Sequence, residues 1–97
     1  MPKGKCLTKD RKKDAIDKLK RIEGRIKGLI KMLEDDRYCI DILMQISSTH
    51  EALRVVGKGV IQNYLEVCAT DGLNSKSKKI QQEIYNELMD VIYKYVK

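Results

Sequence analysis

A chain of 97 residues is long enough for one small domain, and a domain of this size buries only a modest core when it folds alone, so we expect it to oligomerise. It contains no Trp or Phe, one Pro and 35% charged residues, a composition that favours long amphipathic helices and argues against a β-sheet fold. The formal net charge of +6 favours an anionic partner, either nucleic acid or a membrane surface. We therefore predict an all-α fold, and charge alone does not choose between the two partners.

The N-terminal segment, residues 1–9, is rich in lysine and contains Pro2 and Gly4, which is typical of a mobile basic arm. It lacks the apolar core of a signal peptide. No stretch of the sequence approaches the about 18 consecutive apolar residues of a membrane span. We therefore expect a cytoplasmic protein with no membrane partner.

Residues 10–35 are predicted to form an amphipathic helix, because their apolar residues recur at spacings of three and four. The apolar stripe consists of Ile16, Leu19, Ile22, Ile26, Leu29, Ile30 and Leu33. Lys18, Arg21 and Arg25 follow one flank of this stripe. Such charges form either a solvated helix face or a surface that contacts an anion, and their spacing fits both interpretations.

A second helix is predicted over residues 38–69, again from apolar periodicity. Gly57 and Gly59 each weaken this helix by up to about 1 kcal/mol relative to Ala. No Pro or polar cluster accompanies them, so we expect one unbroken helix. Residues 70–75 have the composition of a loop, and a third helix is expected over 76–96. Together these elements predict a single helical domain over residues 10–97.

Three cysteines, Cys6, Cys39 and Cys68, are an odd number with wide spacing, which argues against a disulfide framework and predicts reduced thiols. Cys39 and Cys68 are 29 residues apart, near the two ends of the long helix. That separation is about 43 Å along a helix axis, at about 1.5 Å per residue, so the two thiols cannot share a site within one helix. If two such helices pack antiparallel about a two-fold axis, Cys39 of one protomer falls beside Cys68 of the other. Alternatively, both cysteines are small buried hydrophobic residues.

The surroundings of the three cysteines differ. Tyr64 precedes Cys68 by four residues and so shares its helix face. Cys39 begins a helix, where the macrodipole favours a negative charge, so it is the expected nucleophile. Cys6 lies in the arm, either as an ordinary exposed thiol or as a third soft ligand.

His50, the only histidine, forms a row with Arg54 and Lys58 at successive intervals of four residues. One histidine with two cations is a poor ligand set for a metal ion, so this row is better interpreted as an anion-facing surface. The sequence contains no recognisable pairing of a nucleophile with a base and no glycine-rich phosphate loop. We therefore do not expect an enzyme.

Three segments carry a family resemblance: RIEGRIKG at 21–28, RYCIDILMQIS at 37–47 and NYLEVC at 63–68. They resemble the copper-sensitive operon repressor family, also called the CsoR/RcnR/FrmR family, and the similarity extends from about Ala15 to Cys68. The resemblance implies a three-helix protomer with one long central helix, an antiparallel dimer and a disc-shaped tetramer of two dimers. It also implies a repressor that binds operator DNA and releases it when an effector occupies a site between subunits.

The copper-sensing branch of this family binds Cu(I) through one Cys near the start of the second helix and a His and Cys, four residues apart, on the partner chain. Cys39 and Cys68 match the two cysteines, whereas Tyr64 takes the place of the histidine. A phenol is a poor ligand for soft Cu(I), although two thiolates can still bind it in a nearly linear arrangement. Tyr38, directly before Cys39, resembles the copper-sensing branch.

Other effectors remain open. A dithiol pair without the histidine resembles the branch that senses persulfides and other reactive sulfur species. A formaldehyde-sensing branch uses an N-terminal proline and the first cysteine, which Pro2 and Cys39 match, but the arm is longer here and Cys68 has no role in that pattern. A helical metal-binding module without a DNA target is a further alternative.

For DNA, the resemblance implies basic contacts from Lys18, Arg21 and Arg25, with weaker additions from Arg54 and Lys58. Lysines and arginines that neutralise phosphates give an affinity that falls steeply with salt. The sequence shows no recognition-helix signal, so we expect DNA shape to contribute to specificity.

Overall fold

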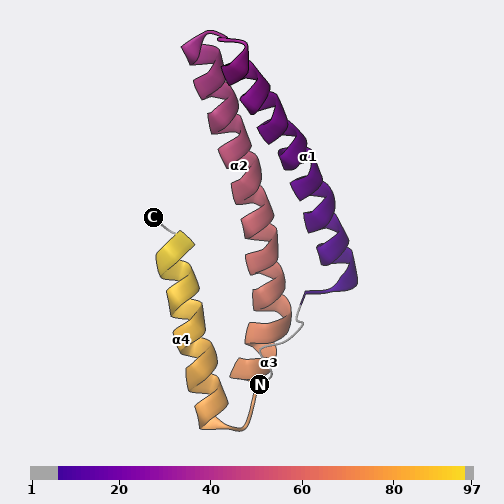
Figure 1. The fold of residues 1–97 in the computed structure, drawn as a ribbon. Coiled ribbons are helices and arrows are strands. Elements are labelled where there is room, and N and C mark those ends of the chain that lie inside the picture. Colours follow the sequence, from indigo (N-terminus) through magenta and orange to yellow (C-terminus); the bar gives the residue numbers. More distant parts are fainter. Residues whose placement is uncertain (1–6, 96–97) are drawn as a thin grey trace. The chain divides into compact units, whose positions relative to one another are not determined.

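The computed structural model describes residues 7–95, and within that range it is helical without strands. Its elements are α1 (Lys9–Glu34), α2 (Cys39–Asn63), the π-helix η1 (Tyr64–Ala69), α3 (Thr70–Leu73) and α4 (Lys78–Tyr95) (Figure 1). The all-α prediction with three long helices is confirmed. Most of the predicted basic arm, with Pro2 and Cys6, lies outside the described residues. No helix in the described part is long and apolar enough to cross a membrane.

The described residues divide into two compact units: the first is Thr8–Val60, and the second combines Leu7 with residues 61–95. In the first, α1 and α2 lie side by side as an antiparallel hairpin (Figure 1). Helix α1 begins where the Thr8 hydroxyl accepts a hydrogen bond from the backbone N–H of Arg11 at 3.3 Å, which satisfies one of the free donors of the first turn. The predicted start at residue 10 is therefore correct to within one residue.

The corner between α1 and α2 is a closed hydrogen-bonded turn. The N–H of Arg37 donates to the C=O of Met32 at 3.0 Å, and the N–H of Asp36 donates to the C=O of Leu33 at 3.2 Å. This pair of bonds is the Schellman arrangement, which requires a left-handed residue after the helix end. Asp36 supplies it with φ of 53°, a conformation in which a residue with a Cβ is strained. The direction of the chain after α1 is thereby fixed.

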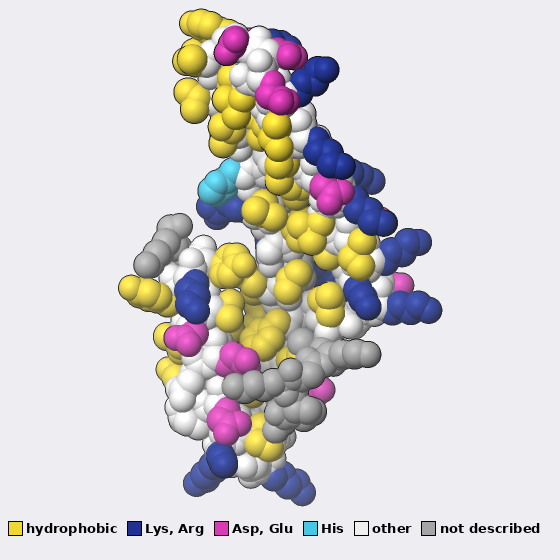
Figure 2. Space-filling view, viewed as in Figure 1, with side chains coloured by type: hydrophobic (Ala, Val, Ile, Leu, Met, Phe, Trp, Pro, Cys, Tyr) yellow, Lys and Arg dark blue, Asp and Glu magenta, His cyan; other side chains and the backbone are white. Residues whose placement is uncertain are grey.

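The hairpin buries few apolar side chains of its own: Ile22 from α1 with Ile42 and Val56 from α2. Helix α2 runs unbroken through Gly57 and Gly59, as predicted. Much of the apolar surface stays exposed, including Leu43 at 58% and Met44 at 66%. Figure 2 shows hydrophobic side chains along the hairpin, with Lys and Arg gathered toward the α1 side.

In the second unit, α2 passes without a break into η1 and then α3. The Thr70 hydroxyl donates to the C=O of Leu65 at 2.6 Å, five residues earlier, and so supports the wide π-helical turn. The loop predicted over 70–75 is therefore wrong for its first four residues, which are helical. The chain then turns, and Ser77 caps α4 by accepting a hydrogen bond from the N–H of Ile80 at 3.4 Å.

The core of this unit forms where η1, α3 and α4 meet. Cys68, Ala69 and Ile84 are buried there, and Gly72 packs directly against Ile84. A Cβ placed on Gly72 would lie 2.2 Å from Cγ1 of Ile84, much closer than two carbon atoms can approach. Only glycine therefore allows α3 to pack this closely on α4.

Gly72→Ala is expected to lower the free energy of unfolding by about 1–3 kcal/mol, because the added methyl overpacks this core. Gly24→Ala is the matched control, since a Cβ on Gly24 meets nothing within 4 Å. It should leave stability unchanged or raise it by up to about 1 kcal/mol through helix propensity. Urea titration followed by circular dichroism measures both. Equal stability of the two variants would contradict the packing described for Gly72.

Candidate metal centre and nucleic-acid interface

Cys39 is the first residue of α2 and carries a free, exposed thiol. The helix hydrogen bonds begin beside it, where the N–H of Ile42 donates to the C=O of Tyr38 at 3.2 Å. The N–H groups of a first helical turn have no partner within the helix, so they favour negative charge nearby. Tyr38 precedes the thiol and is 69% exposed, so the solvent reaches both side chains.

Cys68 differs from Cys39 in its helix, its exposure and its bonding state. It lies in η1, its side chain is only 8% exposed, and its sulfur is disulfide-bonded. The prediction of reduced thiols is therefore wrong for Cys68 in this structure, because an odd number of cysteines excludes a complete framework but not a single bond. A sulfur in a disulfide is not a thiolate ligand, so any metal chemistry at Cys68 requires its reduction.

Cys39 and Cys68 are 29 residues apart in the sequence. They belong to different compact units, with the length of α2 between them in the sequence. Among the residues that the structure describes, no group of three or more His, Cys, Asp or Glu side chains could hold a metal ion. The described residues of one chain thus provide the two cysteine sulfurs without a complete three-donor site.

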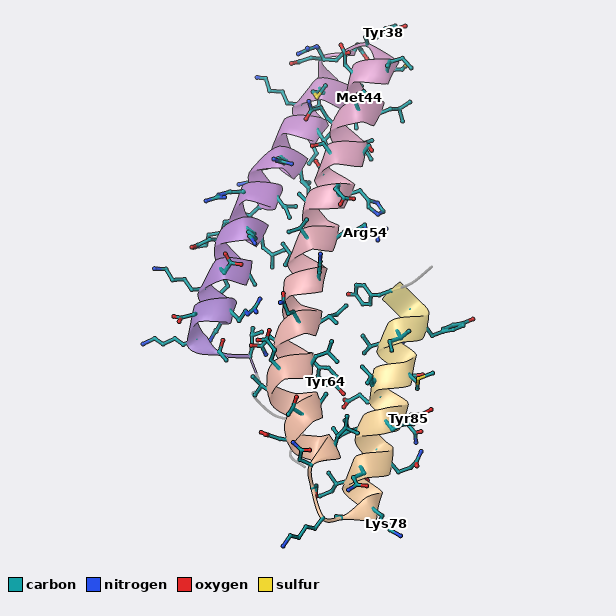
Figure 3. All side chains as sticks on the ribbon, turned by 180° about the vertical axis from the view of Figure 1, so that it is seen from behind. Tyr38, Met44, Arg54, Tyr64, Lys78 and Tyr85 are labelled. Atoms are coloured by element: carbon teal, nitrogen blue, oxygen red, sulfur yellow. The ribbon has the colours of Figure 1, made fainter. Side chains whose placement is uncertain are left out.

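Tyr64, the first residue of η1, points toward α4 (Figure 3), and its hydroxyl donates to Oε2 of Glu87 at 2.8 Å. Burial, then this hydrogen bond and the negative charge of the carboxylate, raise the pKa of Tyr64 from its usual 10.0 to about 12. The phenol is therefore protonated at neutral pH, and its O–H group is used in the hydrogen bond to Glu87. A protonated phenol is not a ligand for a soft metal ion.

This pKa predicts that Tyr64 ionises at a higher pH than a tyrosine with the usual pKa of 10.0. Ultraviolet titration of the phenolates should show a component near pH 12 that is missing in Tyr64→Phe. Because the pKa is raised on folding, the contact stabilises the fold fully below about pH 10 and loses its effect as the pH rises toward 12. A late component that persists in Tyr64→Phe would contradict the assignment, and Tyr85→Phe, which alters an exposed tyrosine, is the control.

The basic residues predicted for α1 share one helix face, since Lys18, Arg21 and Arg25 are three, four and seven residues apart. Lys18 forms an ion pair with Asp14 at 3.0 Å, which partly offsets its charge. Arg25 donates through Nη1 to Oγ of Ser48 at 3.4 Å, a contact that joins α1 to α2. Arg21 is exposed.

The basic residues predicted for α2 lie elsewhere on the hairpin. Arg54 borders an open groove of about 780 Å³ on α2, together with His50 and Glu51 and with apolar side chains such as Leu43 and Met44. Lys58 lies one helical turn after Arg54 and is exposed. Within the hairpin, the basic surface is thus densest along α1, and Arg54 belongs to a largely apolar face.

Sequence reasoning missed two groups of residues. Glu87 lies 23 residues from Tyr64, so no helical spacing signals the contact. Arg37 and Gln45 meet side chains of α1 in a pocket at the α1–α2 corner. The acidic residues before Arg37 could have signalled a corner between two helices. The direction of the Arg37 side chain, however, depends on the geometry of the turn, which the sequence does not show.

Comparison with known proteins agrees with this fold. Residues 11–94 match the metal-sensitive transcriptional repressor family. The chain is 38% identical over 88 residues to the copper-sensing transcriptional repressor CsoR of Bacillus subtilis (strain 168), covering 90% of this chain and 84% of that protein. It is 43% identical over 53 residues to the copper-sensing transcriptional repressor RicR of Mycobacterium tuberculosis (strain ATCC 25618 / H37Rv), covering 55% of each.

A solved structure gives the same result. The crystal structure of the copper-sensing repressor CsoR with Cu(I) from Geobacillus thermodenitrificans NG80-2 aligns with a TM-score of 0.82 at 38% identity, covering 100% of this chain and 94% of that chain. The family resemblance found in the sequence is thereby confirmed. The chain belongs to the metal-sensitive transcriptional repressor family.

Proposed function

We propose that this protein is a DNA-binding transcriptional repressor whose affinity for its operator falls when Cu(I) binds between Cys39 of one chain and Cys68 of another. The observation that carries the proposal is the similarity to copper-sensing repressors over 90% of the chain. Such a regulator acts on operator DNA in the cytoplasm and performs no catalysis.

The site is proposed to lie between chains, because the described residues of one chain contain no group of three or more metal donors, and Cys39 and Cys68 belong to different compact units. The exposed apolar face of α2 supports such an assembly, since contiguous apolar surface of this kind usually contacts a partner. An antiparallel pairing about a two-fold axis brings Cys39 beside the partner's Cys68 twice per dimer. The full assembly is proposed to be a tetramer of two such dimers.

Within this site the two sulfurs are the proposed ligands. Thiolates are soft donors that suit Cu(I), and two of them suffice for a linear arrangement. Tyr64 is not a ligand in the proposal, because its proton is held by Glu87. Cys6 is proposed as a candidate third donor, and Tyr38 as a neighbour of the site, because it directly precedes Cys39.

DNA binding is proposed for the basic face of Lys18, Arg21 and Arg25, with Arg54 and Lys58 as weaker contacts. These side chains neutralise backbone phosphates and give affinity without reading bases. Effector and DNA stabilise different arrangements of the same oligomer, so each weakens the binding of the other by an equal factor.

A second effector is favoured by two observations. Cys68 is disulfide-bonded in the structure, and Tyr64 provides no nitrogen donor of the kind a metal site would use. The same thiol pair could therefore respond to reactive sulfur, with the two cysteines joined through sulfur while a polysulfide is reduced to hydrogen sulfide. Loss of both thiolates, instead of metal binding, would then be the change that lowers the affinity for the operator.

The test is an operator titration of the fully reduced protein, with no effector, with Cu(I) and with an inorganic polysulfide. We expect tight binding that weakens with salt, and a drop of about 5–150-fold with the true effector, the usual range of allosteric coupling. Release by Cu(I) supports the metal sensor, and release by polysulfide alone supports the second candidate. Absent or salt-insensitive DNA binding would overturn the repressor function and leave a helical metal-binding module.

A further inference from the structure

We propose that the pocket at the α1–α2 corner is a phosphate-binding site formed by Arg25, Lys31 and Arg37, and that it receives a phosphate group of the DNA backbone. This inference adds a contact to the proposed function and partly rests on it. The other possible source of the same chemistry is free inorganic phosphate.

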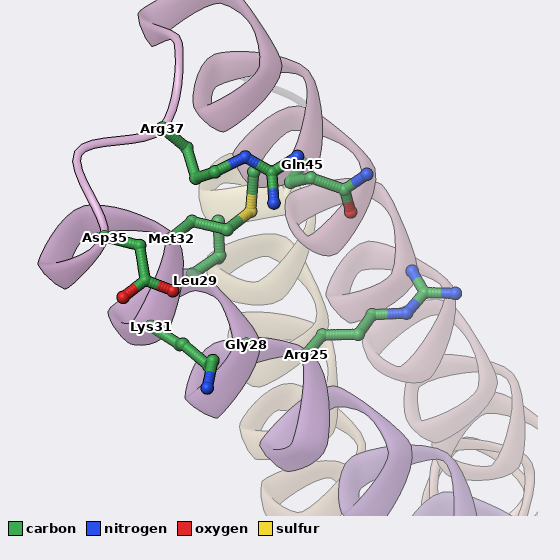
Figure 4. Close-up of a pocket in the computed structure, with 8 residues that line it drawn as sticks. All are labelled: Arg25, Gly28, Leu29, Lys31, Met32, Asp35, Arg37 and Gln45. Carbon is green, nitrogen blue, oxygen red and sulfur yellow. The ribbon is translucent and has the colours of Figure 1, made fainter.

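The pocket lies entirely within the first unit and has a volume of about 340 Å³. It is bounded by the end of α1, the turn and the second helical turn of α2 (Figure 4). Its lining residues are Arg25, Gly28, Leu29, Lys31, Met32, Asp35, Arg37 and Gln45. The space is larger than one phosphate group, so a phosphodiester with its neighbouring sugars can approach from the open side.

Charge favours an anion in this pocket. The lining contains three cations, Arg25, Lys31 and Arg37, and a single carboxylate, Asp35, which leaves it a net charge of +2. Figure 4 shows Asp35 on the same side as Lys31, whereas Arg37 and Arg25 lie toward α2. Arginine presents a planar fork of N–H donors that matches phosphate oxygens, and the side-chain amide of Gln45 adds another donor.

The backbone of Arg37 is held in place by the turn. Its N–H is bonded to the C=O of Met32, so the residue cannot swing away without breaking the closed turn. Figure 4 shows its side chain reaching across Met32 toward Gln45. Gly28 contributes no side chain, and the space above its Cα is open. The backbone of the site is thus held by the turn before an anion arrives, which lowers the part of the entropy lost on binding that comes from the main chain.

The location also connects this site with the proposed effector site. Arg37 lies two residues before Cys39, on the segment that links the turn to the first turn of α2. A phosphate held by Arg37 and an effector held by Cys39 therefore act on the same short segment. Such proximity gives the two ligands a direct means of opposing each other.

The first experiment measures phosphate alone. Inorganic phosphate is titrated into the isotope-labelled protein at constant ionic strength, with chloride as the reference, and the backbone amide signals of Gly28 and Gln45 are followed by NMR. We expect saturable shifts in the wild type that are lost in Arg37→Gln. Lys79→Gln, which removes one exposed cation on α4, should keep them.

The second experiment measures DNA. The slope of log affinity against log salt for an operator duplex should become about 0.9 units shallower for each phosphate contact that Arg37→Gln removes. Gly28→Glu provides an independent variant, since its side chain enters the open space and brings a carboxylate into the pocket. Both variants should retain the wild-type helix content by circular dichroism, and Lys79→Gln should retain the wild-type slope.

The outcomes separate this inference from the proposed function. A shallower slope in both variants assigns the pocket to the DNA backbone, and phosphate shifts with an unchanged slope assign it to free phosphate. Unchanged slopes together with no saturable shifts overturn the phosphate site while leaving the repressor intact. If the wild type binds no DNA, the repressor function fails and the NMR titration alone decides whether the pocket binds phosphate.

Discussion

Cys39→Ser is expected to abolish the response of operator affinity to Cu(I). In the wild type, Cu(I) should weaken operator binding by about 5–150-fold, whereas the ratio in the variant should be one. The physical reason is that the hydroxyl of serine is a hard, neutral donor and cannot replace the thiolate that soft Cu(I) prefers. Fluorescence anisotropy of a labelled operator measures the ratio, and titration against a chromophoric Cu(I) chelator measures the stoichiometry.

The companion variant is Cys6→Ser, which makes the same chemical change at another cysteine and tests whether Cys6 is a third donor. An unchanged stoichiometry and ratio would remove Cys6 from the ligand set, and a loss of either would add it. Both proteins must be fully reduced, because Cys68 is disulfide-bonded in the structure. A Cys39→Ser protein that still binds one Cu(I) per chain would remove Cys39 from the proposed ligand set.

Tyr64→His is expected to raise the affinity for Cu(I) by about tenfold or more, which corresponds to about 1.4 kcal/mol per tenfold change. The imidazole adds a nitrogen donor four residues before Cys68, whereas the native phenol is protonated and bonded to Glu87. Competition with the same chelator measures the change. The variant therefore tests whether this position limits the metal affinity of the site.

Tyr64→Phe is the control for this substitution. It removes the hydroxyl and its bond to Glu87 without adding a donor, so the Cu(I) affinity should stay within about twofold of the wild type. A large loss in Tyr64→Phe would make the tyrosine a ligand after all. Equal affinities of the histidine variant and the wild type would mean that residue 64 does not face the metal.

The helices could be predicted from the sequence because their apolar residues repeat with the period of an α-helix. Helix α1 runs from Lys9 to Glu34, against a predicted 10–35. The π-helix could not be predicted in this way. Its wider turn covers only six residues, too few for a change of period to be visible, and it is supported by the bond from Thr70 to Leu65.

The residue types of the candidate site were predictable from the sequence, but the hydrogen bond of Tyr64 and the oxidation of Cys68 were not. The sequence identified Cys39, Cys68 and Tyr64 through the family resemblance. It did not reveal that Tyr64 is tied to Glu87, because that contact depends on the chain reversal before α4. Nor did it reveal the bond at Cys68, since oxidation depends on which sulfurs meet in space. The roles proposed for these residues stay predictions.

The closed turn at Asp36 also has a consequence for how quickly the protein folds. Only residues 35–38 separate α1 from α2, so the hairpin is built from contacts between neighbouring segments, and such low contact order gives folding in microseconds to milliseconds. Association of chains is instead a bimolecular process whose speed depends on concentration. Formation of the hairpin, including the left-handed turn at Asp36, is therefore expected to be faster than association of chains at low protein concentration.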